Sequence, residues 1–235
     1  LKDRASVLSI QHAIEQKKDT LIAASTGNAG SSLAALAAYH GVKSIIFTPA
    51  SAPPAKLTQI RQHGATLVPI DGNYDEAFDL AFDWAKKKNL YSRNTGVNPI
   101  LAEGKKTVAL EIAEQNNWEV PDHIFIPVGD GCIISGVFKG FFDLLALGWI
   151  DHLPRLHAVQ AEGSAAIVNS LSRGGEINAV EANTVADSIS VDKPRDGDKA
   201  RRAVLESGGM GFMISDDQIL KIQKSLASST GIFAE

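Results

Sequence analysis

Three short segments of this sequence combine residue types that could bind an anion or react with a carbonyl group. The first is Ser25-Thr26-Gly27-Asn28, which lies between an apolar run ending at Ala24 and a helical pattern beginning near Ala29. Free backbone N–H groups at a helix start, together with two hydroxyls and an amide, would hold a carboxylate or a phosphate without a buried cation. Because serine, threonine and asparagine are also common helix caps, an ordinary N-cap is an equally open interpretation.

The second segment is Gly129-Asp130-Gly131-Cys132, which follows an apolar run ending at Val128 and precedes another helical pattern. Glycines allow a backbone to wrap a phosphate closely because they have no Cβ. The carboxylate of Asp130 would repel a phosphate unless it points away and only the main chain is used. An alternative is a nucleotide-binding turn with Glu162 as the ribose-binding acid, although the glycine spacing differs from G-x-G-x-x-G.

The third segment is Lys2-Asp3-Arg4, directly before an apolar helical pattern formed by Val7, Leu8, Ile10 and Ile14. A lysine beside a chain end is usually a solvated charge. A lysine that forms a Schiff base must instead be desolvated or lie near other cations, so that its neutral form is populated.

Apolar strands alternate with amphipathic helices along the chain, and this alternation is typical of parallel α/β folds. The pattern predicts strands at residues 20–24, 44–48, 66–70, 123–128 and 155–161. It predicts helices at residues 29–39, 55–63, 74–88, 103–115, 132–147, 198–206 and 216–228. The turn-forming stretch 91–102 indicates a division into two lobes, residues 1–97 and residues 98–235, and the polar stretch 174–197 indicates a surface excursion.

The composition argues against several classes of partner. With 235 residues, of which 44% are hydrophobic, the chain can bury a substantial core, and its formal net charge of -4 provides no basic surface for nucleic acid. No apolar run approaches the roughly 20 residues that span a bilayer. The six histidines form no pair or cluster with metal-ligand spacing, so we expect no metal. A small-molecule site is the remaining expectation.

Cys132 is the single cysteine of the sequence, which excludes an internal disulfide and a zinc cluster of cysteines. This cysteine usage is compatible with a reducing cytoplasm. The sequence begins at Leu1 without a methionine and ends at Glu235, just after the apolar pair Ile232-Phe233. We therefore expect both ends of the natural protein to lie outside this sequence.

Taken in this order, the three segments resemble the pyridoxal-phosphate enzymes of the tryptophan synthase β type (fold type II), and most closely the threonine synthases. Leu1-Lys2-Asp3-Arg4 is similar to the latter part of a Ser-x-Lys-Asp motif, Ser25-Thr26-Gly27-Asn28 to a Ser/Thr-x-Gly-Asn loop, and the turn at Gly129 to a glycine-rich cradle. The resemblance covers nearly the whole chain. Further similar segments are Glu103-Gly104-Lys105-Lys106-Thr107, Val159-Gln160-Ala161-Glu162-Gly163, and Ser188-Ile189-Ser190-Val191 with Pro194-Arg195.

The resemblance implies a role for each of these segments. Lys2 would carry pyridoxal 5'-phosphate as a Schiff base and move protons, and the amide of Asn28 would meet the cofactor's 3-hydroxyl. The loop of Ser25, Thr26, Gly27 and Asn28 would hold the substrate carboxylate. The cofactor phosphate would be bound by Val128, Gly129, Asp130, Gly131 and Cys132. The implied fold is a two-lobed three-layer αβα structure with largely parallel sheets, helices on both faces and the cofactor in the interlobe cleft.

The resemblance also implies a cytoplasmic homodimer that acts on a small amino-acid substrate. Threonine synthases hold the phosphate of O-phosphohomoserine with an Asn-Ser or Asn-Thr pair and an arginine a few residues later. Asn94-Thr95 matches the pair, but the expected arginine is replaced by Ile100-Leu101-Ala102. Arg93, Lys105 or Lys106 could supply the cation, and we take Lys105 as a candidate substrate-binding residue.

Conversion of O-phosphohomoserine and water to threonine and phosphate is the activity that the resemblance implies. Because the arginine is missing, dehydration or β-replacement of serine or threonine substrates remains an alternative. An alternative from another class is a nucleotide-binding α/β module without covalent chemistry, which would use the Gly129 turn and Glu162.

Overall fold

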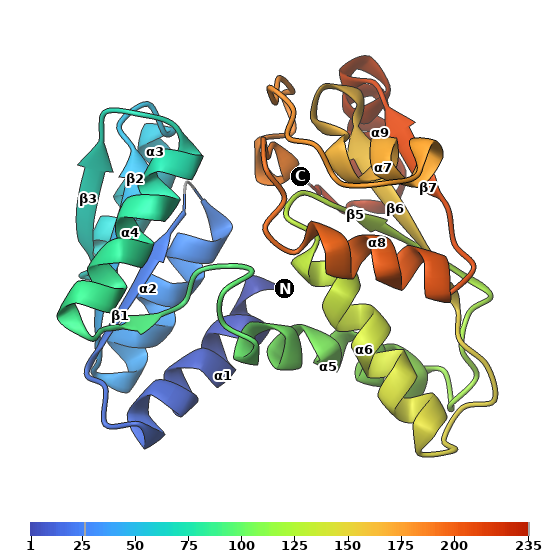
Figure 1. Cartoon of the computed structure of the whole chain (residues 1–235), viewed down its shortest axis with the longest axis horizontal. Helices are drawn as coiled ribbons and strands as arrows, with labels where there is room; N and C mark the ends of the chain where they lie inside the picture. Colours follow the sequence, from blue (N-terminus) through green and yellow to red (C-terminus); the bar gives the residue numbers. More distant parts are fainter. Residues whose placement is uncertain (26, 235) are drawn as a thin grey trace. The chain divides into compact units, whose positions relative to one another are not determined.

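The computed structural model describes residues 1–25 and 27–234, and it divides into two compact units. The first unit is Leu1–Val108 and the second is Ala109–Glu235. Each unit is built around a parallel β-sheet with helices packed against it (Figure 1). The helix α5 (Ile100–Gln115) begins in the first unit and ends in the second.

The first unit alternates helices and strands, and its sheet has the strand order β3-β2-β1-β4 with every neighbouring pair parallel. Its elements before α5 are α1 (Lys2–Glu15), β1 (Thr20–Ala24), α2 (Asn28–His40), β2 (Lys43–Pro49), α3 (Pro54–Gln62), β3 (Thr66–Ile70), α4 (Tyr74–Lys88) and β4 (Tyr91–Ser92). Because the strands are parallel, their carboxyl ends share one edge of the sheet, where open α/β sheets bind their ligands.

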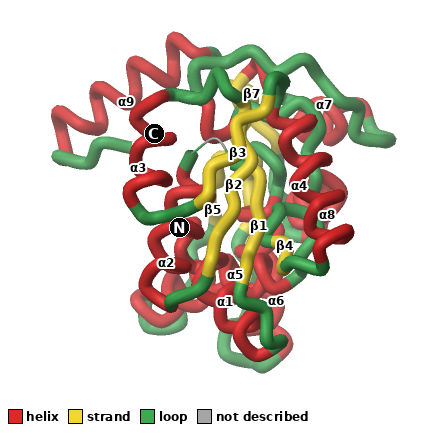
Figure 2. Tube along the Cα trace, turned by 90° about the vertical axis from the view of Figure 1, so that its left-hand side faces the viewer, coloured by secondary structure: helices red, strands yellow, loops and turns green. Residues whose placement is uncertain are grey.

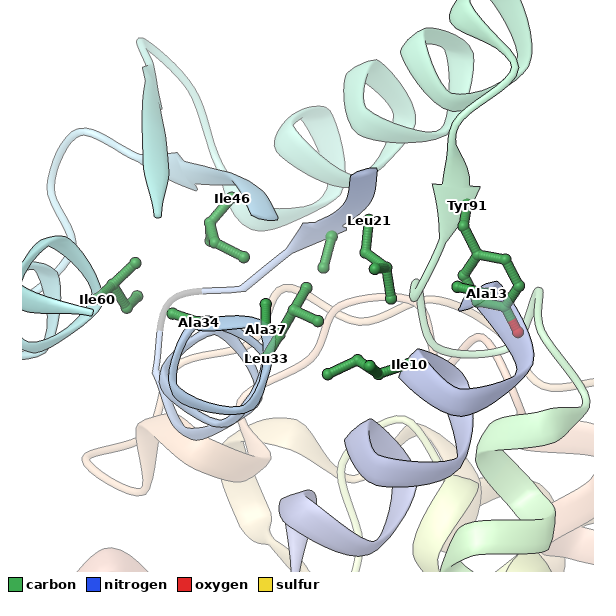
Figure 3. Close-up of a cluster of buried hydrophobic side chains, with 10 residues drawn as sticks. Ile10, Ala13, Leu21, Leu33, Ala34, Ala37, Ile46, Ile60 and Tyr91 are labelled. Atoms are coloured by element: carbon green, nitrogen blue, oxygen red, sulfur yellow. The ribbon is translucent and has the colours of Figure 1, made fainter. Parts of the chain in front are cut away.

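The core of the first unit lies on both faces of β1. Leu21 and Ala23 pack into a cluster with α1, α2 and α3, whereas Ile22 and Ala24 pack with α4 into a second cluster. Figure 2 shows the strands between α2 and α3 on one side and α4 on the other, and Figure 3 shows the first cluster. Successive residues of a strand point to opposite faces, so a strand buried on both faces must be apolar throughout.

Helix boundaries in the first unit follow local signals. α2 ends at Gly41, whose φ of 68° closes the helix in the left-handed region. α4 begins at a capping box in which Asn73 accepts from the Glu76 N–H at 2.9 Å and Glu76 accepts from the Asn73 N–H at 2.8 Å. α5 begins at Ile100 rather than at the predicted residue 103, because Asn98 Oδ1 accepts from the Ile100 N–H at 3.1 Å.

The second unit contains a sheet with the strand order β5-β6-β7, again parallel throughout. Its elements after α5 are β5 (His123–Pro127), α6 (Cys132–Ala146), β6 (Arg155–Ala161), the short 3-10 helix η1 (Glu162–Ser164), α7 (Ala166–Arg173), the 3-10 helix η2 (Asp187–Ile189), α8 (Gly197–Glu206), β7 (Gly211–Ile214) and α9 (Asp216–Thr230). α6 and α8 contact each other and β6, and α7 contacts β6 and β7.

One face of the second sheet carries aromatic side chains in contact. The register pairs Phe125 with His157 and Val159 with Phe212. The His157 ring stacks on Phe125 with centroids 4.6 Å apart, and Phe125 and Phe212 lie 5.6 Å apart. Phe125 is nevertheless 60% exposed, so the helices of this unit leave part of this face uncovered.

The predicted α/β class with parallel sheets and helices on both faces is confirmed, and all the strands predicted from apolar runs are present. The sequence patterns miss β4, α7 and β7, which are short elements of two, eight and four residues. The predicted surface excursion at 174–197 is wrong in part, because Val191 and Asp196 are buried. Ser164 Oγ accepts from the Val191 N–H at 3.0 Å and joins this stretch to η1, the 3-10 helix that follows β6.

None of the helices within residues 1–25 and 27–234 is both long and apolar enough to cross a membrane.

Candidate cofactor and substrate site

Lys2 and Asn28 are the first residues of two neighbouring helices, α1 and α2. Each helix joins β1 through a short loop, so both run opposite to β1 and parallel to one another (Figure 1). Ser32 Oγ donates to Ser6 Oγ at 2.8 Å, and these serines lie one turn after Asn28 and Lys2 respectively. The helix pair therefore brings Lys2, which is half-buried, and Asn28, which is exposed, to the same end.

Ser25 shapes the loop between β1 and α2. Its Oγ accepts from the Gly30 N–H at 2.8 Å and from the Gly27 N–H at 3.2 Å, and the Ser25 N–H donates to Phe47 O at 2.9 Å. The buried hydroxyl thus satisfies amide donors at the start of α2, as a helix cap does. The predicted substrate contact through Thr26 lies outside the described residues.

Lys56 lies beside this loop, although no sequence motif indicates it. It belongs to α3, and a Cβ placed on Gly27 would be 3.3 Å from its Nζ. A cation here favours a carboxylate bound to the loop. Only the packing of α3 against α2 brings Lys56 to Gly27, so no local pattern could have predicted it.

Asn94 extends the carboxyl edge of the first sheet just beyond β4. Its Oδ1 accepts from the Ala24 N–H at 2.7 Å, and the neighbouring Arg93 N–H donates to Ile22 O at 2.8 Å. Asn94 is 1% exposed, and within the described part of the chain its buried Nδ2 atom has no hydrogen-bond partner. Thr95, which follows it, is half-buried. The predicted Asn-Thr pair therefore lies at the same sheet edge as Ser25.

A buried polar network connects this edge to α1. Arg93 donates to Ser6 Oγ through Nε at 3.3 Å and through Nη2 at 3.2 Å. Gly104 of α5 packs closely against α1, because a Cβ there would overlap the carbonyl oxygen of Arg4. Arg4 Nη1 in turn donates to Thr107 Oγ1 at 2.8 Å. α1, β4 and α5 are thus fixed to one another around the helix start that carries Lys2.

In the second unit the glycine turn lies between β5 and α6. The Val128 N–H donates to Val159 O at 2.9 Å, and Gln160 Nε2 donates to Val128 O at 3.1 Å. Gly131 is the N-cap of α6 with φ of 92°, and among the described residues no side chain caps this helix. The start of a helix without a side-chain cap is a kind of backbone site at which anions bind in proteins.

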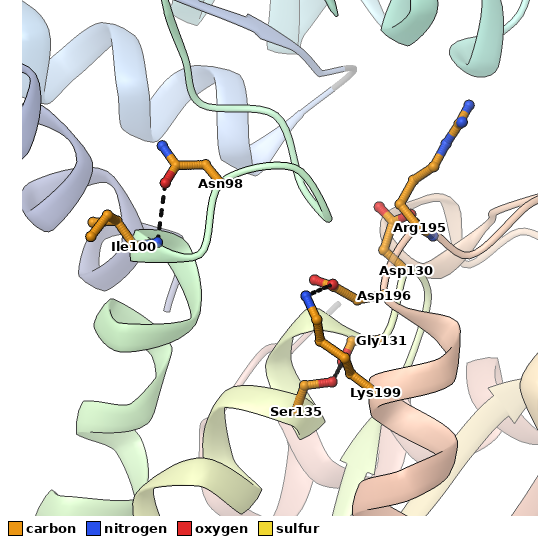
Figure 4. A network of polar contacts seen from close by, with 8 residues as sticks. All are labelled: Asn98, Ile100, Asp130, Gly131, Ser135, Arg195, Asp196 and Lys199. Atoms are coloured by element: carbon orange, nitrogen blue, oxygen red, sulfur yellow. Dashed lines mark hydrogen bonds and ion pairs between the residues drawn. The ribbon is translucent and has the colours of Figure 1, made fainter.

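The Asp130 carboxylate turns toward the stretch before α8 (Figure 4). Its Oδ1 accepts from the Arg195 N–H at 3.2 Å, and its backbone oxygen accepts from the Asp196 N–H at 2.9 Å. The Asp196 carboxylate accepts from Lys199 Nζ at 2.7 Å. The Asp130 carboxylate is therefore held by the backbone of the stretch before α8.

Residues 1–235 match the protein family described as pyridoxal-phosphate dependent enzyme. The chain belongs to this family.

Curated relatives of this family member include threonine synthases. It is 37% identical over 237 residues to the threonine synthase of Methanocaldococcus jannaschii, in an alignment that covers 100% of this chain and 58% of that protein. It is 34% identical over 235 residues to the threonine synthase of Mycobacterium tuberculosis, in an alignment that covers 100% of this chain and 63% of that protein. The chain therefore spans about three fifths of the length of these relatives.

Solved structures of the same fold include maize serine racemase, with a TM-score of 0.83 and 22% identity over 100% of this chain and 68% of that chain. Threonine deaminase isoform 2 of Solanum lycopersicum also has a TM-score of 0.83, with 23% identity over 100% of this chain and 62% of that chain. At these identities the likeness concerns the fold alone.

Pyridoxal phosphate is the cofactor of the family, and residues of the second unit fit its phosphate ester. The start of α6 offers backbone donors, and the side chain of Asp130 is turned onto the Arg195 backbone. A Cβ on Gly129 would lie 3.0 Å from the Ile189 Cα, so the turn is tightly packed there. Cys132 is buried, and we assign it no chemistry.

The predicted site residues form two groups, one in each unit. In the first unit the predicted residues lie at one edge of the sheet, at the starts of α1 and α2, in the loop between β1 and α2, and in the Asn-Thr pair. These residues are Lys2, Ser25, Gly27, Asn28, Asn94 and Thr95. The second unit holds Val128, Gly129, Asp130, Gly131 and Cys132 in consecutive positions. That the two groups form one site stays a prediction.

Proposed function

We propose that the chain is the catalytic part of a threonine synthase, which converts O-phosphohomoserine and water to threonine and phosphate. The support is 32–37% identity to threonine synthases over the whole chain, together with the two groups of site residues. The observation that carries the proposal is the parallel pair α1 and α2, which places Lys2 and Asn28 at one end beside the carboxyl edge of the sheet. We also propose that the protein is a homodimer and that it is located in the cytoplasm.

The first unit serves in this proposal as the smaller lobe, and the second as part of the larger, cofactor-binding lobe. When bound, pyridoxal phosphate acts as an electron sink for carbanions at the substrate's Cα. The start of α6 would hold its phosphate ester, and Asn28 would orient its ring through the 3-hydroxyl.

Lys2 performs the proton transfers in this proposal. Its amine would hold the cofactor when no substrate is bound, and during turnover it would take protons from Cα and Cβ and return protons to Cγ and Cα. The loop of Ser25, Gly27 and Asn28 orients the substrate through its carboxylate, with Lys56 adding positive charge. Phosphate would leave from Cγ, which takes up a proton and becomes the methyl group of threonine. Water would add its hydroxyl at Cβ and release its other proton to the departing phosphate, so the overall reaction balances.

A second candidate function keeps the cofactor and removes water from serine or threonine, with release of ammonia. The observation that favours it is the apolar, buried Leu101 in the stretch where the arginine of threonine synthases is expected. The family match assigns pyridoxal phosphate, so the nucleotide-binding interpretation of Gly129 and Glu162 is not carried further.

The test uses the full-length protein purified with its cofactor. We expect an absorbance band of the lysine-bound cofactor that Lys2→Ala abolishes and that Lys17→Ala, an exposed lysine just beyond the same helix, leaves intact. Release of phosphate from O-phosphohomoserine, measured against release of ammonia from threonine, separates the two candidate functions. An unchanged band in Lys2→Ala would remove the assignment of Lys2, and ammonia release without threonine formation would select the second candidate.

A further inference from the structure

The second unit contains a pocket of about 680 Å³, a volume in the range of small-molecule sites. Two short loops line it, residues 118–120 between α5 and β5 and residues 148–152 between α6 and β6. Both loops precede neighbouring parallel strands, whereas the glycine turn follows β5. The pocket and the glycine turn therefore lie at opposite edges of the sheet, separated by roughly the length of β5, about 16 Å.

Two tryptophan side chains form adjoining walls of this pocket. The rings of Trp118 and Trp149 meet edge to face, with centroids 4.7 Å apart and planes at 90°. Trp118 is 40% exposed and Trp149 is 56% exposed, so both indoles also face solvent. The right angle between the planes makes a corner of aromatic surface that a ligand can contact from within the pocket.

The backbone positions both indoles by the same device at the ends of α5 and α6. Each tryptophan directly follows a residue in the left-handed region, namely Asn117 with φ of 54° and Gly148 with φ of 72°. The N–H of each tryptophan donates to the helix carbonyl five residues earlier, at 2.7 Å for Trp118 and 3.0 Å for Trp149. The aromatic corner is thus fixed before a ligand arrives, which favours binding.

The charged side chains of the lining are acidic. Glu119 and Asp151 contribute carboxylates, and among the described residues the lining includes neither lysine nor arginine. A hydrogen bond with His152 lowers the pKa of the Asp151 carboxyl, so this group stays ionised at neutral pH. The carboxylates attract a cation and repel an anion.

We propose that this pocket binds a small organic ammonium ion whose nitrogen carries methyl groups. A cation in front of an indole is attracted by the electrons of the ring, and tryptophan gives the strongest such attraction among the aromatic side chains. Methyl groups pack on the rings, as in the aromatic cages that bind quaternary ammonium groups. A bare ammonium group is more strongly hydrated and would lose more on entering. The proposal is independent of the reaction at the cofactor.

The test titrates the full-length holoenzyme with tetramethylammonium chloride and follows the methyl protons by saturation-transfer NMR. We expect a dissociation constant of about 1–10 mM, because cation–π contacts at exposed sites are individually weak. tert-Butanol, which has a similar size and no charge, should bind at least about 10-fold more weakly. Potassium chloride at the same concentrations controls for ionic strength.

Variants of the aromatic corner test its residues. Trp149→Leu should weaken binding of tetramethylammonium by at least about 5-fold, because one of the two ring contacts is lost. The matched control is Trp84→Leu in the first unit. Trp84 is 39% exposed and also meets an aromatic ring, that of Phe47, but it does not line this pocket. This control should bind like the unchanged protein.

The outcomes separate this proposal from the proposed function. Binding that persists in Lys2→Ala and is lost in Trp149→Leu would support the pocket, whatever reaction the cofactor supports. Equal binding of tetramethylammonium and tert-butanol would overturn the proposal, because charge would then have no part in recognition. An equal loss in Trp84→Leu and Trp149→Leu, or no binding to the full-length protein, would overturn it as well.

Discussion

Gly131 gives the start of α6 its shape through a single backbone angle. Its φ of 92° lies in the region that residues with a Cβ rarely adopt, and a Cβ there would lie 2.8 Å from both Asp196 O and the Ala200 Cβ. The turn can therefore pack against the start of α8 and still present its amides. Asp130 completes the turn by bonding to the Arg195 backbone.

We predict that Gly131→Ala weakens cofactor binding by at least about 10-fold, because the turn must move from both Asp196 and Ala200 or change its angle. The matched control is Gly148→Ala, which has a similar φ of 72° but no neighbour that a Cβ would meet. Titration of the apoprotein with pyridoxal phosphate measures the effect. Equal affinities in the two variants would show that the close packing of Gly131 is irrelevant to the cofactor.

In the first unit, Ser6 joins α1 to α2 and to Arg93, the residue directly after β4. Its buried Oγ accepts from Ser32 and from two nitrogens of Arg93, residues that are 26 and 87 positions away. A hydroxyl with two lone pairs is suited to such a junction. The orientation of Lys2 relative to Asn28 depends on this junction, because both helices begin one turn before its serines.

We expect Ser6→Ala to lower the free energy of unfolding by about 1–3 kcal/mol, since Ser32 and Arg93 lose a buried acceptor. Ser9→Ala is the control, because Ser9 is equally buried but its Oγ donates to the Ser6 carbonyl within the same helix at 3.0 Å. Urea unfolding of both variants measures the difference. A loss for Ser6→Ala no greater than for Ser9→Ala would contradict the junction.

Across the molecule as a whole, the two units are stabilised differently. The sheet of the first is covered on both faces by apolar helices, whereas the second buries an imidazole at the centre of its aromatic face. His157 is 2% exposed, its Nδ1 accepts from the Met210 N–H at 3.1 Å, and its Nε2 lies 2.9 Å from His123 Nδ1. Burial, followed by the charges of His123 and Arg155, lowers the pKa of His157.

A lowered histidine pKa makes the native state lose stability in acid. Below about pH 6.5 the unfolded chain binds a proton that native His157 resists, so the unfolding free energy falls until the pH reaches the lowered native pKa. We expect His157→Gln to flatten this slope and exposed His63→Gln to preserve it. Urea unfolding at several values between about pH 5 and pH 8 measures both slopes. If His157→Gln leaves the dependence of the unfolding free energy on pH unchanged, groups other than His157 cause the loss of stability in acid.

Local sequence patterns are sufficient to predict most of the strands and helices. Apolar runs such as Leu21 to Ala24 and caps such as Asn73 act between near neighbours, so their structural meaning is readable from the chain. The short elements α7 and β7 carry no comparable signal, because too few residues repeat to define a period.

Which side chains meet became evident only in the tertiary structure. The alignment of Lys2 with Asn28, the engagement of Arg93 by Ser6, the turning of Asp130 toward Arg195 and the approach of Lys56 to Gly27 all join residues distant in sequence. The physical reason is that the partner of a charge or of a hydrogen-bond donor is often a residue far away in the sequence. Folding brings such partners together, and no local pattern encodes them.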